Sequence, residues 1–298
     1  MTHPKTSPAA AFMVAGGGIA IYSCMDAIMK RLSIDSGAYS TVLWRSVAGV
    51  AITGSVFLAR RRPWPGRDAL NLHIARGLAA GASILLFFWG LERVPMAQSI
   101  ALTFLAPLIA LYLAAAFLGE TIRRAAIAGS LVAVVGVLVI AAGEIRAEAN
   151  ADSLAGTVAI VVASVLYAAS LILLRRQAQA ADPLEVTVFT SLVIGTVLLA
   201  GAPWFSGWPA ATQWPAIGAA AVLGTVSSVC LAWAYGRAEA QVLAPVEYTA
   251  FVWSAILGYL VFGERVSSFT LAGAALIVGG CIVAVRRAMP VPMSEAGA

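Results

Sequence analysis

Apolar runs of roughly 20 residues, separated by short charged or polar stretches, recur along the whole chain. An α-helix rises about 1.5 Å per residue, so a run of this length crosses a hydrocarbon core of about 30 Å. The first run contains Asp26 and ends at Lys30, which is typical of a transmembrane helix and not of a cleaved signal peptide. The pattern predicts ten transmembrane helices, at residues 9–29, 38–59, 70–91, 96–118, 123–143, 155–175, 185–203, 214–235, 241–262 and 267–287.

The second half of the chain repeats the first. Residues 75–139 align without a gap on residues 219–283, and matching charged and glycine residues fall at the same points between apolar runs. The shared positions include Trp89 and Trp233, Arg93 and Arg237, and the pairs Gly119-Glu120 and Gly263-Glu264. The front of each half matches more weakly, with Tyr22 on Tyr167 and Lys30 on Arg175. We interpret the pattern as a duplication, with repeats at residues 1–147 and 148–298.

The duplication predicts a geometry, because five helices per repeat is an odd number. The second repeat then enters the membrane from the opposite face, and a site is expected near the midplane between the two halves. Lys and Arg gather in the loops on the side that holds both termini, which places both termini in the cytoplasm. The acidic stretch Glu144–Asp152 is the expected linker. The alternative is a duplication retained only for packing.

Composition agrees with a membrane protein. The chain is 61% hydrophobic and only 11% charged, with a mean hydropathy of +0.90, whereas soluble domains carry about 25% charged residues. Its three cysteines all lie inside apolar runs, and two histidines are too few for a multi-histidine metal site. The net charge of +5 comes from loop arginines, so it indicates topology and not nucleic-acid binding. No cofactor motif and no set of catalytic residues is found, so the chain is not predicted to be an enzyme.

Four ionisable residues fall inside the predicted helices. They are Asp26, Arg45, Arg76 and Glu247. Each costs about 2.5–3.5 kcal/mol at the centre of a spanning helix, so each is expected to face the interior or a partner. Matching depths predict a cluster of Asp26 with Arg45 or Lys30, and a second contact between Arg76 and Glu247. The alternative for each is a static ion pair that holds two helices together.

Small polar and aromatic residues complete the set of candidates for substrate binding or coupling. They are Tyr22, Ser83, Gln98, Thr103, Tyr167 and Tyr248. An apolar pocket with a few polar anchors suits a small amphiphilic organic molecule better than an inorganic ion. Pro107 and Pro245 are expected to bend their helices and to free backbone carbonyls. The alternatives are a membrane-interface location for the aromatic residues and fixed kinks at the prolines.

Ten helices in two repeats, each with Gly-Glu between its fourth and fifth helices, resemble the EamA family of the drug/metabolite transporter superfamily. Further similar pieces are Tyr22-Ser23 to Asp26, Trp44-Arg45, Arg76-Gly77 and Pro107, although Phe251 stands where a second matching proline would be. The resemblance implies a multi-pass carrier of the bacterial inner membrane that works by alternating access. It is in particular similar to the YddG-type exporters of amino acids.

We therefore expect a secondary transporter that exports amino acids, aromatic or otherwise apolar, and related metabolites. It is expected to act as a monomer on a small molecule, in contact with membrane lipid and with no nucleic acid. The alternatives are an importer of a larger metabolite such as S-adenosylmethionine or riboflavin, a channel, and a membrane scaffold that transports nothing. Polar residues are too sparse for a channel, and the chain has no sizeable soluble domain of the kind a sensor carries.

Overall fold

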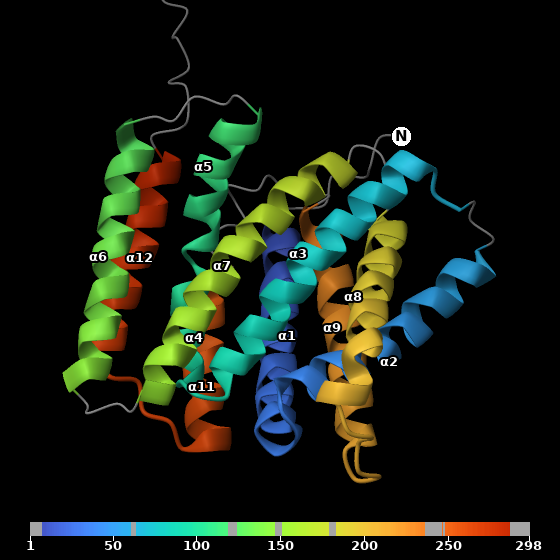
Figure 1. Cartoon of the computed structure of the whole chain (residues 1–298). Helices are drawn as coiled ribbons and strands as arrows, with labels where there is room; N and C mark the ends of the chain where they lie inside the picture. Colours follow the sequence, from blue (N-terminus) through green and yellow to red (C-terminus); the bar gives the residue numbers. More distant parts are fainter. Residues whose placement is uncertain are drawn as a thin grey trace, which may run out of the picture.

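The computed structural model describes residues 8–60, 64–118, 124–146, 151–178, 183–235, 246 and 248–286, and in this part of the chain α-helices are joined by short connections (Figure 1). Seven segments are long and apolar enough to cross a membrane, and three shorter apolar helices accompany them. The helices are α1 (Pro8–Ser36), α2 (Ala38–Ala59), α3 (Arg67–Leu91), α4 (Met96–Thr103), α5 (Ala106–Leu118), α6 (Arg124–Arg146), α7 (Ala151–Ala178), α8 (Pro183–Phe205), α9 (Trp214–Tyr235), α11 (Thr249–Phe262) and α12 (Ser268–Arg286).

Within the described residues each predicted run contains helix, with one correction, and residues 241–245 and 247 of the ninth run lie outside them. The fourth is not continuous, because a turn at Phe104–Leu105 divides it into α4 and α5. The ends of the expected linker Glu144–Asp152 are helical, since α6 continues to Arg146 and α7 begins at Ala151, and residues 147–150 lie outside the described residues. Several helices extend beyond the apolar runs through polar residues, as α1 does to Ser36 and α6 to Arg146.

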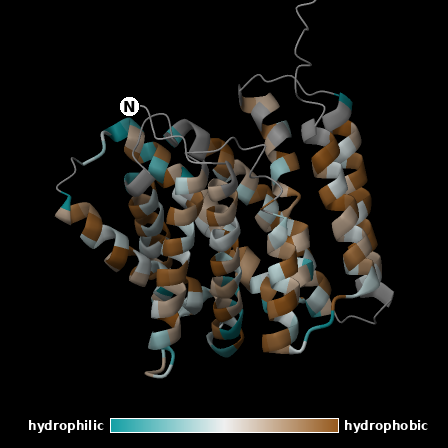
Figure 2. Cartoon of the chain, turned by 180° about the vertical axis from the view of Figure 1, so that it is seen from behind, coloured by the Kyte–Doolittle hydropathy of each residue, from teal (hydrophilic) through white to brown (hydrophobic). Residues whose placement is uncertain are grey.

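The outer surface is apolar, as a lipid-facing surface must be. Figure 2 shows hydrophobic positions along the lengths of the helices and hydrophilic positions concentrated towards their ends. Leu58, Leu131 and Leu260 are each more than 60% exposed. Water would penalise this much exposed apolar surface, whereas hydrocarbon accepts it. The protein is therefore a multi-pass membrane protein.

Helix contacts fall into matched sets. The pair α6 and α12 stands side by side at one end of the molecule, and α2 lies at the other (Figure 1). Between them α3 packs on α7 and α8, while α9 packs on α1 and α2. Likewise α5 packs on α7, and α11 on α1. Every one of these contacts joins the first half of the sequence to the second, so the interior of the molecule is an interface between the halves.

Glycines allow the closest of these contacts. A Cβ at Gly136 of α6 would lie 2.6 Å from the carbonyl oxygen of Gly273 on α12. A Cβ at Gly77 would lie 2.6 Å from Val193 of α8, so this glycine lets α3 and α8 approach closely. Small residues of this kind let helix backbones approach each other in lipid, where dispersion contacts drive association.

Candidate functional site

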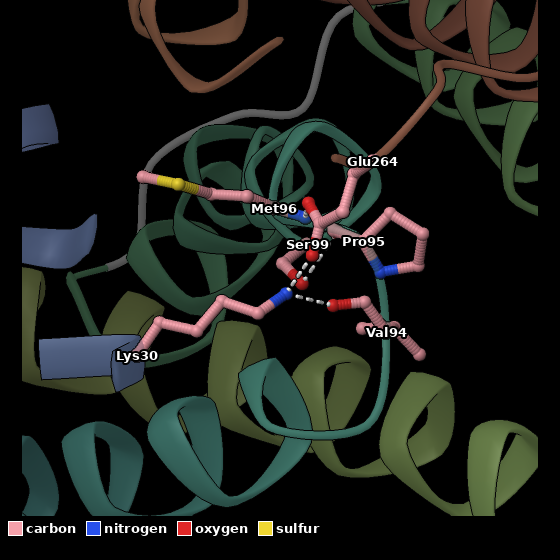
Figure 3. A network of polar contacts seen from close by, with 6 residues as sticks. All are labelled: Lys30, Val94, Pro95, Met96, Ser99 and Glu264. Atoms are coloured by element: carbon pink, nitrogen blue, oxygen red, sulfur yellow. Dashed lines mark hydrogen bonds and ion pairs between the residues drawn. The ribbon is translucent and has the colours of Figure 1, made fainter. Parts of the chain in front are cut away.

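Lys30 lies at the centre of a buried polar network near the C-terminal end of α1 (Figure 3). Its Nζ donates to the carbonyl oxygen of Val94 at 2.7 Å and forms an ion pair with Glu264 Oε1. The other carboxylate oxygen, Oε2, accepts a hydrogen bond from the backbone N–H of Met96 at 2.7 Å. This N–H belongs to the first residue of α4, where a backbone donor has no partner within its helix. The network therefore joins α1, the α3–α4 corner and the end of α11.

The structure explains why a glycine precedes the glutamate in the Gly-Glu pair of the second repeat. Gly263 ends α11 with φ of 68°, a left-handed conformation that glycine adopts at little cost. The backbone N–H of Glu264 then donates to the carbonyl of Gly258, and this turn directs the carboxylate towards Lys30 and Met96. A Cβ on Gly258 would lie 2.7 Å from Glu264 Oε2, so the glycine also leaves room for the carboxylate.

Of the two partners expected for Asp26, which were Arg45 or Lys30, Lys30 binds elsewhere. Asp26 and Lys30 share a face of α1, yet the Lys30 side chain reaches across to Glu264. Sequence reasoning recognised the Gly-Glu pair as a repeat marker and did not assign Glu264 a partner. The occurrence of a glutamate at the same point of both repeats was the signal available in the sequence. The equivalent Glu120 lies outside the described residues.

Asp26 and Arg45 lie in the same region of the interior but do not form an ion pair. Asp26 is 4% exposed, and no hydrogen bond or ion pair joins it to another described residue. Arg45 interacts electrostatically with both Asp26 and Tyr22. Its Nη1 contacts Met25 Sδ at 3.9 Å, and its Nε is buried with no hydrogen-bond partner in the described part of the chain. Asp26 and Arg45 are thus neighbouring charged groups that interact electrostatically without forming the expected ion pair.

Tyr22 lies one helical turn before Asp26 on α1, and its side chain is 40% exposed. It interacts electrostatically with both Asp26 and Arg45. The expectation that Tyr22 contacts substrate stays a prediction.

Arg76 lies on α3 and binds α8. Its Nη1 donates to Thr190 Oγ1 at 2.6 Å, and it interacts electrostatically with Tyr167 of α7. The Nε of Arg76 is buried, and no described residue accepts a hydrogen bond from it. The expected partner Glu247 lies outside the described residues, so that contact stays a prediction.

Neighbouring helices bind two backbone carbonyls at the break before Pro107. Pro107 has no N–H to continue the helix. The carbonyl of Leu102 accepts from Ser164 Oγ at 3.3 Å, and that of Phe104 accepts from Cys281 Sγ at 3.3 Å. Pro107 itself lies in the first turn of α5, and the expectation that it bends the helix along a substrate path stays a prediction. Pro245 lies outside the described residues.

The remaining predicted candidates have structural partners. Ser83 donates to the carbonyl of Ala163 at 2.8 Å, and Gln98 donates to Thr157 at 3.2 Å. Both bonds hold α7 against its neighbours. Thr103 bonds within its own turn, to the carbonyl of Ile100 at 2.7 Å. Tyr248 packs its ring edge-on against Phe104, with centroids 5.2 Å apart.

Sequence reasoning missed a second buried polar cluster, around His73. This side chain is fully buried near the start of α3, with Nε2 3.0 Å from Glu185 Oε1 and Nδ1 2.8 Å from Gln177 Nε2. Its ring stacks on Phe189 with 5.0 Å between centroids. A lone histidine near the end of an apolar run gave no spacing signal. In the described part of the chain no group of three His, Cys, Asp or Glu could hold a metal ion.

A cavity of about 200 Å³ lies at the α1–α2 corner, separate from these clusters. Its walls include Ser36, Ser40, Thr41, Trp44 and Gln213. The rings of Trp44, Trp208 and Trp214 lie edge-on or tilted to one another, with centroids 4.7 to 5.9 Å apart. Tryptophans at helix ends are typical of the membrane–water interface.

Comparison with known proteins identifies the family. The model of the EamA-like transporter family matches twice, at residues 9–142 and 154–286. The chain belongs to the EamA-like transporter family. The pseudopaline exporter of Pseudomonas aeruginosa is 26% identical over 270 residues, which is 89% of this chain and 92% of that protein. A probable terminal-alkyne amino-acid exporter of Streptantibioticus cattleyicolor is 29% identical over 250 residues, 82% of each chain.

A solved crystal structure shares the fold of this EamA-like protein. It has a TM-score of 0.61 at 24% identity and covers 96% of this chain and all of the other. An uncharacterised transporter of Helicobacter pylori is 25% identical over 220 residues, 70% of this chain and 72% of that protein. The family membership means that the buried charges between the halves belong to a transporter and not to an enzyme.

Proposed function

We propose that this protein is a secondary transporter that exports amino acids or metabolites derived from them by alternating access. The observation that carries the proposal is the buried Asp26, which lies beside Arg45 at the interface of the halves without forming an ion pair. An unpaired charge in this environment costs several kcal/mol, so it is retained where a ligand or a proton completes it. An α-amino acid carries the ammonium and carboxylate that these two side chains bind.

The similar proteins support export as the direction of transport and amino-acid derivatives as the class of substrate. Two of the similar proteins are named as exporters, one of pseudopaline and one of a terminal-alkyne amino acid. At 26–29% identity they favour export of small amphiphilic molecules without fixing the molecule itself. The apolar cluster packed between the helices that carry Asp26 and Arg45, which includes Met25 and Val42, favours an apolar or aromatic side chain on the substrate. The proposal includes that the protein acts as a monomer in a bacterial inner membrane, with both termini in the cytoplasm.

Alternating access requires two halves that move against each other, and we propose that these are inverted repeats. Three observations support this arrangement. The family model matches twice, the contacts of α3 reappear as those of α9, and the helix break at Phe104 has its counterpart at Tyr248, whose ring packs on it. In this arrangement the Lys30 network closes the outer end of the interface and must open to release substrate.

Counterflow in proteoliposomes tests the function. Vesicles loaded with unlabelled methionine should accumulate labelled methionine transiently and saturably, with competition by aromatic amino acids. Asp26→Asn should reduce the exchange at least tenfold, whereas Asp35→Asn, which changes an exposed acid on the same helix, should not. Flux that is linear in concentration would indicate a channel, and no flux for any amino acid would refute the proposal.

A further inference from the structure

The cavity of about 200 Å³ lies where the α1–α2 corner meets the α8–α9 corner, at one end of the helices (Figure 1). Its lining comes from both halves of the chain, from α1 and α2 in the first and from residues 207–217 in the second. Engineered protein cavities of about 150 Å³ bind benzene. The space is therefore large enough for a six-membered ring that carries substituents.

The polar part of the lining carries hydroxyl and amide groups. Thr41 is only 3% exposed, and its hydroxyl has no hydrogen-bond partner among the described residues. Buried hydroxyls are nearly always bonded, so this one points to a group that enters the cavity beside it. Ser36 and Ser40 add two more hydroxyls, and Gln213 adds an amide. None of the described side chains that line the cavity is charged, so the lining suits a neutral ligand with several hydroxyls.

The aromatic part of the lining consists of Trp44 and Trp208, whose rings lie edge-on with 4.7 Å between their centroids. The face of an aromatic ring is electronegative, so it attracts the hydrogens of C–H bonds that point at it. A pyranose has C–H bonds on its faces and hydroxyls around its rim. A lining that combines indole rings with hydroxyl and amide groups matches both features of such a sugar.

Hydrogen bonds within the protein hold this lining in place. Trp44 Nε1 donates to the carbonyl of Gly207 at 3.2 Å, and Gln213 Nε2 donates to Ser36 Oγ. Both bonds join the first half of the chain to the second. The other end of the Gln213 amide accepts from the N–H of Ala210 at 3.0 Å. A lining that is already ordered loses little entropy on binding, and Ser36 keeps its own O–H to donate to a ligand.

Exposed tryptophans beside the cavity indicate where its ligand comes from. Trp204 and Trp208 are 77% and 78% exposed, near the end of α8 and in the connection that follows. Tryptophans with this exposure at helix ends are typical of the membrane–water interface, at the level of the lipid headgroups. A ligand at this level is reached either from water or from a lipid whose headgroup lies in the same layer.

We propose that this cavity binds a neutral pyranose, either as a free glycoside or as the headgroup of a glycolipid. Trp44 and Trp208 contact the C–H face of the ring. Its hydroxyls bond to Thr41, Ser36 and Gln213. This site is separate from the buried charges between the halves and does not rest on the proposed transport function. Because both halves line the cavity, the ligand stabilises the arrangement in which they meet.

Three probes test the ligand class by saturation-transfer NMR on the full-length protein in a detergent without sugar groups. Methyl glucopyranoside has the ring face and the hydroxyls, cyclohexanol keeps a ring with a single hydroxyl, and choline is a cation that aromatic rings also attract. The glucoside should bind about tenfold more tightly than either, since it alone makes the additional hydrogen bonds. Equal or tighter binding of cyclohexanol or choline, or no binding of the glucoside, would overturn the proposal.

Variants test the two parts of the lining. Thr41→Val removes the hydroxyl but keeps the branched shape, so the glucoside should bind about tenfold more weakly. The unliganded variant should unfold at the same temperature or higher, because it no longer buries an unpaired hydroxyl. Thr41→Ser should retain most of the affinity. Trp208→Ala should also weaken binding, whereas Trp204→Ala, which changes an equally exposed tryptophan outside the lining, should not. Unchanged affinity in Thr41→Val or in Trp208→Ala would contradict the assignment.

Nanodiscs distinguish the two sources of the sugar. The unfolding midpoint is compared in discs of phosphatidylethanolamine alone, in the same discs with monoglucosyl diacylglycerol, and in the first discs with methyl glucopyranoside added to the water. A higher midpoint with the glycolipid only assigns the lipid headgroup, and a higher midpoint with the free glycoside assigns a soluble sugar. No rise with either would refute the site, as would a rise of the same size in Thr41→Val.

Discussion

Replacing Glu264 tests whether the Lys30 network holds the two halves together. Glu264→Gln keeps an oxygen for the N–H of Met96 but removes the charge that Lys30 faces. The two side chains are only 4% and 19% exposed. Removing one partner of a buried ion pair typically costs about 3–5 kcal/mol, because the other charge stays buried and uncompensated. At about 2 °C per kcal/mol for a chain of this size, the midpoint of thermal unfolding should fall by about 6–10 °C.

Thermal unfolding of the purified protein in detergent measures this change. The matched control is Asp35→Asn, which breaks the ion pair with Arg31 on the same helix. Those side chains are 67% and 43% exposed, so the loss should stay below about 1 kcal/mol. Lys30→Met combined with Glu264→Gln should be clearly less destabilised than the sum of the two single changes, since the double variant buries no lone charge. The reasoning fails if Glu264→Gln costs no more than Asp35→Asn, or if the two changes at the network add.

Two further predictions concern packing and pH. Gly136→Ala should destabilise the protein by about 1–3 kcal/mol, since its Cβ meets the backbone of Gly273, whereas Gly279→Ala, which meets nothing within 4 Å, should be neutral or stabilising; unfolding midpoints compare them. Burial raises the pKa of Glu92 above its ordinary value of 4.5, against the opposing effect of Arg93. A raised folded-state pKa gives stability that is present below pH 4.5 and lost as the pH rises through the shifted value, so Glu92→Gln should flatten the melting profile over this window. A profile that Glu92→Gln leaves unchanged would show that the carboxyl contributes nothing.

Periodicity and hydropathy predict the helices well, because a spanning helix needs an apolar run of nearly fixed length. The break at Phe104–Leu105 was not predicted, because the apolar run 96–118 continues through it, although Pro107 indicated a bend nearby. Depth along single helices predicts Asp26 at the height of Arg45, and the two charges interact electrostatically in the structure. These features depend on local sequence or on one coordinate, the height in the membrane.

Partners across the interface were not predictable in the same way. Lys30 binds Glu264, which is 234 residues away in the chain, because the Gly263 turn points the carboxylate inward. The contact between His73 and Glu185 likewise depends on how α3 meets α8. Height gives no information about rotation around a helix axis, and rotation decides which of several charges at one level meet.

The arrangement of the two halves is tested most directly by mapping the sidedness of two loops in cells. A reporter that is active only in the cytoplasm is inserted after Gly66, between α2 and α3, or after Gly207, between α8 and α9. Inverted repeats predict an active reporter at the first position and an inactive one at the second. Activity at both positions, or at neither, would contradict the account and with it the shared site between the halves.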